Sequence, residues 1–382
     1  MASSTHHGQA RRHFVLGAFG ATILLAGCQT GRHQPRLPDP DPVRPVAPVE
    51  RERNLVAVIV PTSGGDGAIG QSIANAATLA LADSRDETLR ITVYNSAGPG
   101  GAAAAAQRAI DDGNRLILGP LLASDVRAAA PVAFRARVPM VTFSNDEGVA
   151  GDGVYIMGFT PDQSIDRVVA HAKASGLGNY AALVPTGLYG QRATQAMIDA
   201  MRRSGGRMTV VEQYDRSPAS VRAAARRLGA KGNFDAVLIG DSGRMAAMAA
   251  PALPRAAKFM GTELWASDKT LGKTPALLGA WYAAAPDTRF NQLSVRYRAR
   301  YGKSPYRLAS MGYDAVLLAV RSSRNWEVGR PFPARELIDK DGFSGVDGNF
   351  RFGRNGIAER LLEVRQIGAT GTTVVSPAAR AF

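Results

Sequence analysis

Short apolar runs of strand length alternate with helix-length segments through most of this 382-residue chain. Leu55–Val60 is followed by a glycine-rich loop and a helix over about 68–82, and Leu89–Tyr94 is followed by an alanine-rich helix over 101–112. A chain that repeats strand and helix forms a parallel sheet with helices on both faces. The order predicts an α/β fold of two doubly wound lobes. Further strands are expected at 116–118, 139–143, 180–184, 207–213, 236–239 and 258–261, with helices at 125–135, 164–175, 191–204, 217–231 and 243–253.

The last third of the chain departs from strict alternation. An aromatic and basic helix is expected over 291–301, followed by an apolar helix over 311–322. The segments 343–352 and 361–367 then predict a hairpin of strands. Arg296, Arg298 and Arg300 on the first of these helices form either a docking face or an ordinary solvated face.

The N-terminus carries an export signal. Arg11 and Arg12 precede an apolar run over 14–26, which is too short to span a bilayer. Residues 24–28 read Leu-Leu-Ala-Gly-Cys, and Cys28 is the one cysteine of the chain. The segment resembles a bacterial lipobox, in which the cysteine becomes the acylated first residue. We therefore expect a lipoprotein signal peptide at 1–27, with lipidation at Cys28. The general secretory and twin-arginine routes both stay open.

Composition excludes several classes of function. Residues 28–53 are polar and proline-rich, which predicts an extended tether. The net charge is +14, but the arginines are scattered, and an envelope protein has few nucleic-acid partners. His171 is the sole histidine after the tether, so no His/Cys metal site or Cys–His dyad can form. The glycine-rich loop at 64–70 lacks the lysine of a P-loop. We expect no catalytic residue, cofactor or metal.

Several motifs resemble those of one family. Val56-Ala-Val-Ile-Val-Pro-Thr-Ser-Gly-Gly64, Leu118-Gly-Pro-Leu-Leu-Ala-Ser124, Val138-Pro-Met-Val-Thr-Phe-Ser-Asn145, Leu188-Tyr-Gly190 and Gly312-Tyr-Asp-Ala315 are similar to segments of type I periplasmic binding proteins of the branched-chain amino-acid family. The resemblance implies two α/β lobes joined by three crossovers within residues 54–382. The first lobe is expected at about 54–160 and 286–340, and the second at about 161–285 and 341–370.

The resemblance also implies where a ligand lies. Ser124 and Ser144 match the positions on the carboxylate side, Tyr189 matches the tyrosine of the cleft, and Glu263 matches the acid that binds an ammonium group. Helix capping is an alternative role for the two serines, and contacts that close the lobes are an alternative for Tyr189 and Glu263. The candidate cleft residues are Ser63, Ser124, Ser144, Asn145, Tyr189 and Glu263.

The chain departs from the amino-acid binders at two loops. Leu121, Leu122 and Ala123 stand where those proteins carry consecutive small hydroxyl residues. Asp146 and Glu147 add negative charge near the carboxylate position and should repel a carboxylate.

These departures resemble a subfamily, the lipoprotein activators of penicillin-binding proteins. Gly119-Pro-Leu-Leu122, Phe143-Ser-Asn-Asp146 and Val154-Tyr-Ile-Met-Gly-Phe-Thr-Pro161 carry that similarity. It implies a non-enzymatic envelope regulator of a penicillin-binding protein. Gln29, which follows the expected acylated cysteine, implies by the lipoprotein sorting rule a lipid anchor at the periplasmic face of the outer membrane. The alternative is a lipid-anchored solute-binding protein that passes an amino acid or a related small molecule to an ABC transporter permease.

Overall fold

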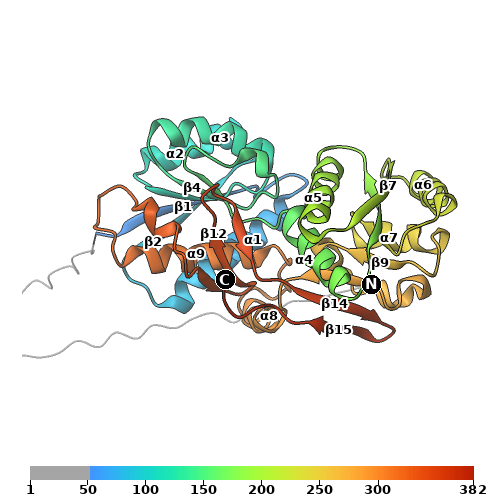
Figure 1. Cartoon of the computed structure of the whole chain (residues 1–382). Coiled ribbons are helices and arrows are strands. Elements are labelled where there is room, and N and C mark those ends of the chain that lie inside the picture. Colours follow the sequence, from blue (N-terminus) through green and yellow to red (C-terminus); the bar gives the residue numbers. More distant parts are fainter. Residues whose placement is uncertain (1–51) are drawn as a thin grey trace, which may run out of the picture. The chain divides into compact units, whose positions relative to one another are not determined.

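The computed structural model describes residues 52–382. The expected signal peptide, Cys28 and all but the last two residues of the expected tether lie outside the described residues. The described residues form one compact unit, shown in Figure 1. Among the described residues, no helix combines the length and the apolar character needed to cross a bilayer.

The first lobe is built on a parallel sheet with the strand order β2-β1-β3-β4-β5. Side chains of β1 alternate between its two faces. Val56, Val58 and Val60 pack toward α1 and α9, whereas Ala57 and Ile59 pack toward α2 and α3. The elements are β1 (Asn54–Val60), β2 (Leu89–Asn95), β3 (Leu116–Leu118), β4 (Met140–Thr142), β5 (Val154–Ile156), α1 (Gly67–Ser84), α2 (Gly101–Asp111), α3 (Ala123–Arg135), α8 (Thr288–Tyr301) and α9 (Ala309–Ser323).

The second lobe repeats this topology with the order β7-β6-β8-β9-β10. Helices α4 and α5 cover one face of its sheet, and α6 and α7 cover the other. Two later strands, β14 and β15, extend the sheet antiparallel beyond β10. The elements are β6 (Asn179–Pro185), β7 (Arg207–Tyr214), β8 (Ala236–Ile239), β9 (Lys258–Gly261), β10 (Trp281–Ala284), β14 (Glu363–Gly368), β15 (Gly371–Ser376), α4 (Pro161–Ala174), α5 (Leu188–Ser204), α6 (Pro218–Lys231) and α7 (Gly243–Ala249).

The C-terminal strands pair differently from the expected hairpin. β11 (Phe343–Gly345), β12 (Gly348–Phe352) and β13 (Ala358–Arg360) form a small antiparallel sheet, while β14 joins β10 instead of β12. Phe343, Phe350 and Phe352 belong to the same core as α1 and α9. Residues 341–360 therefore pack in the first lobe, not in the second as expected, because their aromatic side chains complete the core beneath α9.

The chain passes between the lobes at about 157–160, 285–287 and 361–362, which are the expected three crossovers. Arg360, at the end of β13, connects two of them. Its guanidinium lies 4.3 Å from the ring centre of Phe159 and 5.1 Å from that of Phe350, and it donates to the carbonyl of Met157. This stacking fixes the first crossover against the third.

Candidate functional site: a cleft between the lobes

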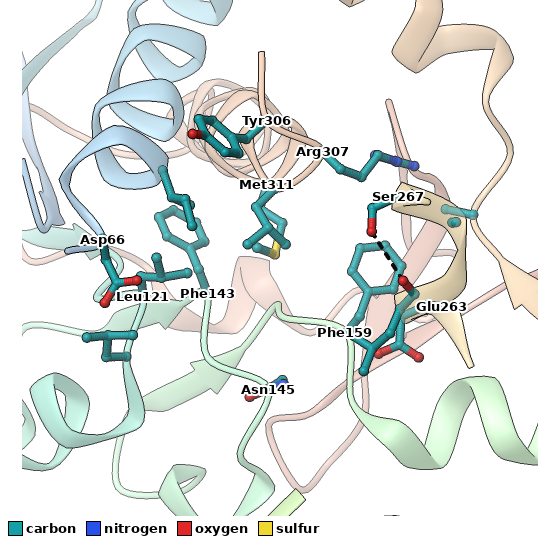
Figure 2. A pocket seen from close by; sticks show the side chains of 16 residues that line it. Asp66, Leu121, Phe143, Asn145, Phe159, Glu263, Ser267, Tyr306, Arg307 and Met311 are labelled. Carbon is teal, nitrogen blue, oxygen red and sulfur yellow. Dashed lines mark hydrogen bonds between the residues drawn. The ribbon is translucent and has the colours of Figure 1, made fainter. Parts of the chain in front are cut away.

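A cavity of about 460 Å³ lies between the two lobes (Figure 2). Its walls come from both lobes and from two of the crossovers, so the cleft depends on how the lobes close. Most of the lining is apolar: Ile69, Leu121, Leu122, Phe143, Phe159, Leu264, Ala266, Ala285, Leu308 and Met311. Such a surface favours a ligand with an apolar body.

A few polar groups interrupt this lining. In Figure 2, Arg307, Ser267 and Glu263 lie toward one side of the view, while Leu121 and Phe143 lie toward the other. The Ser267 hydroxyl donates to the carbonyl of Leu264 at 3.2 Å, the dashed line in the figure. The remaining polar lining residues are Asp66, Asn145 and Tyr306.

Arg307 is held in place from behind the cleft. Its guanidinium forms an ion pair with the fully buried Asp347 and donates to the Ser310 hydroxyl at 3.0 Å. It also lies 4.2 Å from the ring centre of Phe290. A guanidinium carries five N–H donors, so Arg307 can receive an anionic group from the cleft while it keeps these contacts.

Glu263 follows β9 at the start of a short 3₁₀ helix, Glu263–Ser267, and faces the cleft. Ser164 of α4 donates a hydrogen bond to its carboxylate. Burial nevertheless raises the pKa of Glu263 to about 7, and the Ser164 hydrogen bond offsets this only in part. The side chain is therefore protonated in a large fraction of molecules at neutral pH, and it can then donate a hydrogen bond to a ligand.

We expect Glu263→Gln to change how stability depends on pH. From the ordinary pKa of 4.5 to about 7, folded Glu263 keeps a proton that the unfolded chain has lost. The free energy of unfolding of the natural protein therefore falls as pH rises through this window. Gln cannot titrate, so the stability of the variant relative to the natural protein should rise across the window, by on the order of 3 kcal/mol, and then stay level. Urea unfolding at a series of pH values measures this difference in stability.

Asp314 also titrates in this range, because burial and the neighbouring Asp347 raise its pKa to about 7. It is present in both proteins, so its contribution cancels when their stabilities are compared. If the difference in unfolding free energy between Glu263→Gln and the natural protein does not vary with pH, the raised pKa of Glu263 is wrong.

The six candidate residues from the sequence do not all meet at this cavity. Asn145 and Glu263 line it. Tyr189 lines a neighbouring recess, where its hydroxyl lies 3.1 Å from that of Thr262. Burial raises the pKa of Tyr189 well above its ordinary value, so the hydroxyl stays neutral.

The three serines lie elsewhere. The exposed Ser63 accepts a hydrogen bond from the Asn95 amide at 2.9 Å. Ser124 is exposed in the first turn of α3, which has no side-chain cap. Ser144 is buried, and its hydroxyl accepts the backbone N–H of Asp146 at 3.1 Å. None of the three lines the main cavity, and neither Ser124 nor Ser144 caps a helix.

The expected repulsion from Asp146 is wrong. Its carboxylate is buried and forms ion pairs with Arg127 of α3 and with Arg192 of α5. It also accepts the N–H of Gly148 at 3.0 Å. Because two guanidiniums balance this carboxylate, it adds no net negative charge to the cleft.

Helix α8, for which a docking face and an ordinary solvated face were both open, buries one side in the fold and leaves its three arginines exposed. Tyr297 is fully buried in the core of the first lobe. Arg296 forms an ion pair with Asp83 at 3.4 Å, and Arg298 donates to Ser304 at 2.9 Å. The ordinary alternative, a surface helix with one buried face, agrees with these contacts.

Several cleft residues could not be identified from the sequence. Phe143 and Phe159 follow strands at the edge where a doubly wound sheet binds ligands, which is a weak signal. Arg307 has no local sequence signal, because contacts between distant segments bring the loop before α9 to the cleft. His171 does not line the cavity; its ring packs 4.6 Å from that of Trp281. Residues 52–382 contain no cluster of three or more His, Cys, Asp or Glu side chains able to hold a metal.

The model of the periplasmic binding protein family matches residues 55–371. The chain belongs to this family, and its type I fold with two α/β lobes is confirmed. A periplasmic binding protein acts outside the cytoplasm, in the periplasm or the extracellular space, and its family is typically not enzymatic.

The chain is similar to three further proteins, two of them with solved structures. An uncharacterized protein of Rickettsia prowazekii is 22% identical over 179 residues, which cover 47% of this chain and 48% of that protein, so the match spans about half of the relative. A leucine-binding protein from Thermotoga maritima is 21% identical, with a TM-score of 0.64 over 85% of this chain and 98% of its own. A solute-binding protein of an ABC transporter from Rhodopseudomonas palustris, solved with 3,4-dihydroxybenzoic acid, is 19% identical, with a TM-score of 0.66 over 86% and 97%. At these identities the two structures show the fold alone.

Proposed function

We propose that this protein is a solute-binding protein that closes its two lobes on a small, largely apolar organic acid and presents it to an ABC transporter. The observation that carries the proposal is the cavity of about 460 Å³, in which the guanidinium of Arg307 and the carboxyl group of Glu263 face a largely apolar wall. The two similar structures support it, because one is named for leucine and the other holds an aromatic acid.

The polar groups indicate how such an acid binds. Leu121 and Leu122 line the cavity where amino-acid binders are expected to offer hydroxyls, so they cannot hold a carboxylate. Arg307 is the cationic group of the lining and takes this role. Protonated Glu263 donates a hydrogen bond but gives an ammonium group no negative charge. Asp66, the other carboxylic acid of the lining, lies toward the side of the view opposite to Arg307 (Figure 2), away from the place expected for the carboxylate. We therefore expect simple apolar carboxylates to bind more tightly than the corresponding α-amino acids.

Calorimetry tests this with benzoate, phenylacetate, octanoate and leucine. We expect a carboxylate of this panel to bind, and Arg307→Gln to weaken it about 10- to 100-fold, since a charge-assisted hydrogen bond is lost. Arg321→Gln is the control for loss of a paired guanidinium: Arg321 pairs with Asp339 and stacks on Phe343, but this pair is more exposed than that of Arg307 and Arg321 does not line the cavity. Absence of binding across the panel at millimolar concentration would reject the proposal, as would equal binding to the natural protein and Arg307→Gln.

A second candidate function is regulation of a penicillin-binding protein. Leu121 and Leu122 stand where amino-acid binders carry hydroxyl residues that hold a carboxylate. This replacement favours a regulator, because a docking module needs no carboxylate site. Affinity capture from solubilised membranes separates the two functions. Enrichment of a peptidoglycan synthase supports the regulator, and enrichment of transporter subunits supports the solute-binding protein.

Both functions use the same anchor. We propose that Cys28 is acylated and holds the protein at the periplasmic face of the outer membrane, with residues 28–53 as a tether. The mass of the mature N-terminal residue tests this proposal: a triacylated Cys28 is expected, and an unmodified N-terminus would contradict it.

A further inference from the structure

The cleft adjoins a second cavity of about 360 Å³. Asn145 from the first lobe and Leu264 from the second line both spaces, so the two cavities share a boundary. The other residues around the second cavity are Ala123, Asp146, Pro161, Leu188, Tyr189, Arg192 and Arg216. We call this space the basic recess.

Charge distinguishes the basic recess from the main cavity. Arg192 of α5 and Arg216, in the loop after β7, line it together with Asp146. Arg127 also pairs with Asp146, and Arg216 pairs with the buried Asp241 at 3.0 Å. Within these ion pairs, three guanidiniums share two carboxylates.

Arg192 is incompletely bonded. It reaches Asp146 at 3.4 Å, near the limit of a hydrogen bond, and its Nε is buried with no hydrogen-bond partner among the described residues. The side chain of Arg192 as a whole is 42% exposed and lines the recess, so an oxyanion there would accept hydrogen bonds from its accessible N–H groups.

We propose that the basic recess is a second anion subsite, so that the ligand is an apolar molecule with an acidic group at each end. This inference rests on the proposed solute-binding function. One carboxylate lies at Arg307, the apolar spacer packs on Phe159 and Leu264, and the second carboxylate lies between Arg192 and Arg216. Because the Arg192–Asp146 pair joins the two lobes, the second carboxylate also binds where the lobes meet.

Matched pairs of ligands test the subsite in the full mature chain. Calorimetry compares hexanoate through decanoate with the α,ω-dicarboxylates of equal length, at a pH at which every carboxylate is ionised. At the best length, we expect the dicarboxylate to bind at least tenfold more tightly than its monocarboxylate partner. Arg192→Gln and Arg216→Gln should each remove most of this gain, while monocarboxylate binding changes much less.

Arg222→Gln is the control variant, because Arg222 is an exposed arginine of the same lobe that does not line the basic recess. It should keep the full gain, and Arg192→Lys should keep part of it. Thermal unfolding identifies any variant that fails to fold. Because Arg192 and Arg216 lie on different elements, the subsite can still be tested if one of the two variants does not fold. If monocarboxylates bind but dicarboxylates bind no more tightly, the subsite is wrong while the proposed function stands. If neither series binds, the solute-binding function itself fails.

Discussion

Asp347→Ala is expected to lower the free energy of unfolding by about 4 kcal/mol, since removal of one partner leaves a buried charge unpaired. Asp347 is fully buried behind the cleft, where it pairs with Arg307 and accepts the Ser310 hydroxyl at 2.7 Å. Arg360 is buried nearby, and Asp347 is one of the charges that stabilise its cationic form. Asp314 is the other carboxylate that stabilises the cationic form of Arg360. Asp347 raises the pKa of Asp314, so Asp314 ionises more readily in the variant and offsets part of the loss.

Urea unfolding at neutral pH measures this loss. Asp339→Ala is the control, because it removes an aspartate from a partly exposed ion pair with Arg321. Such a pair contributes about 0–1 kcal/mol. Similar losses in the two variants would show that the buried charges around Asp347 are not coupled as the structure indicates.

Gly70→Ala is the second change with a large expected effect. Gly70 lies in the first turns of α1, and a Cβ at this position would come within 1.7 Å of the Pro61 carbonyl oxygen at the end of β1. The obstacle is backbone, so α1 must move away from the sheet. We expect a loss of about 3 kcal/mol, at the upper end for overpacking. The same movement would displace Ile69 in the cleft wall.

Gly65→Ala serves as the matched control for Gly70→Ala. A Cβ at Gly65 would have no atom within 4 Å, so its stability should change little. The second lobe offers an independent repeat: a Cβ on Gly190 of α5 would lie 1.7 Å from the Pro185 carbonyl oxygen. If Gly70→Ala and Gly65→Ala unfold at the same urea concentration, helix α1 is not held against β1 as described.

The elements that the sequence predicted well have local signals. Buried parallel strands such as β1 and β8 are continuous apolar runs, and the helices between them carry apolar residues at helical spacing. The two-lobe architecture follows from their order. Strands β5 and β15 were not predicted. β5 is apolar but only three residues long, and β15 is an edge strand that is exposed along nearly its whole length.

The pairing of the C-terminal strands and much of the cleft depend on contacts between distant segments. No local pattern shows that β14 adds to β10, or that Phe343 and Phe350 complete the core around α9. The charge of Asp146 was visible in the sequence, but its two arginine partners were not. Glu263 could be identified because it directly follows a buried strand, whereas Arg307 comes from a loop that follows a helix.

The crossovers also determine the order in which the molecule can be completed. The parallel part of the second lobe, from β6 to β10, is one continuous stretch, so it can fold as soon as it has emerged. The first lobe is interrupted by it: α1 must wait for α9, more than two hundred residues later, to cover its apolar side. Contacts of such long range slow folding and leave apolar surface open in the meantime. A nascent or truncated chain that ends before α9 therefore has an incomplete first lobe and no complete ligand cleft. Its exposed apolar surface is the kind of surface that chaperones bind.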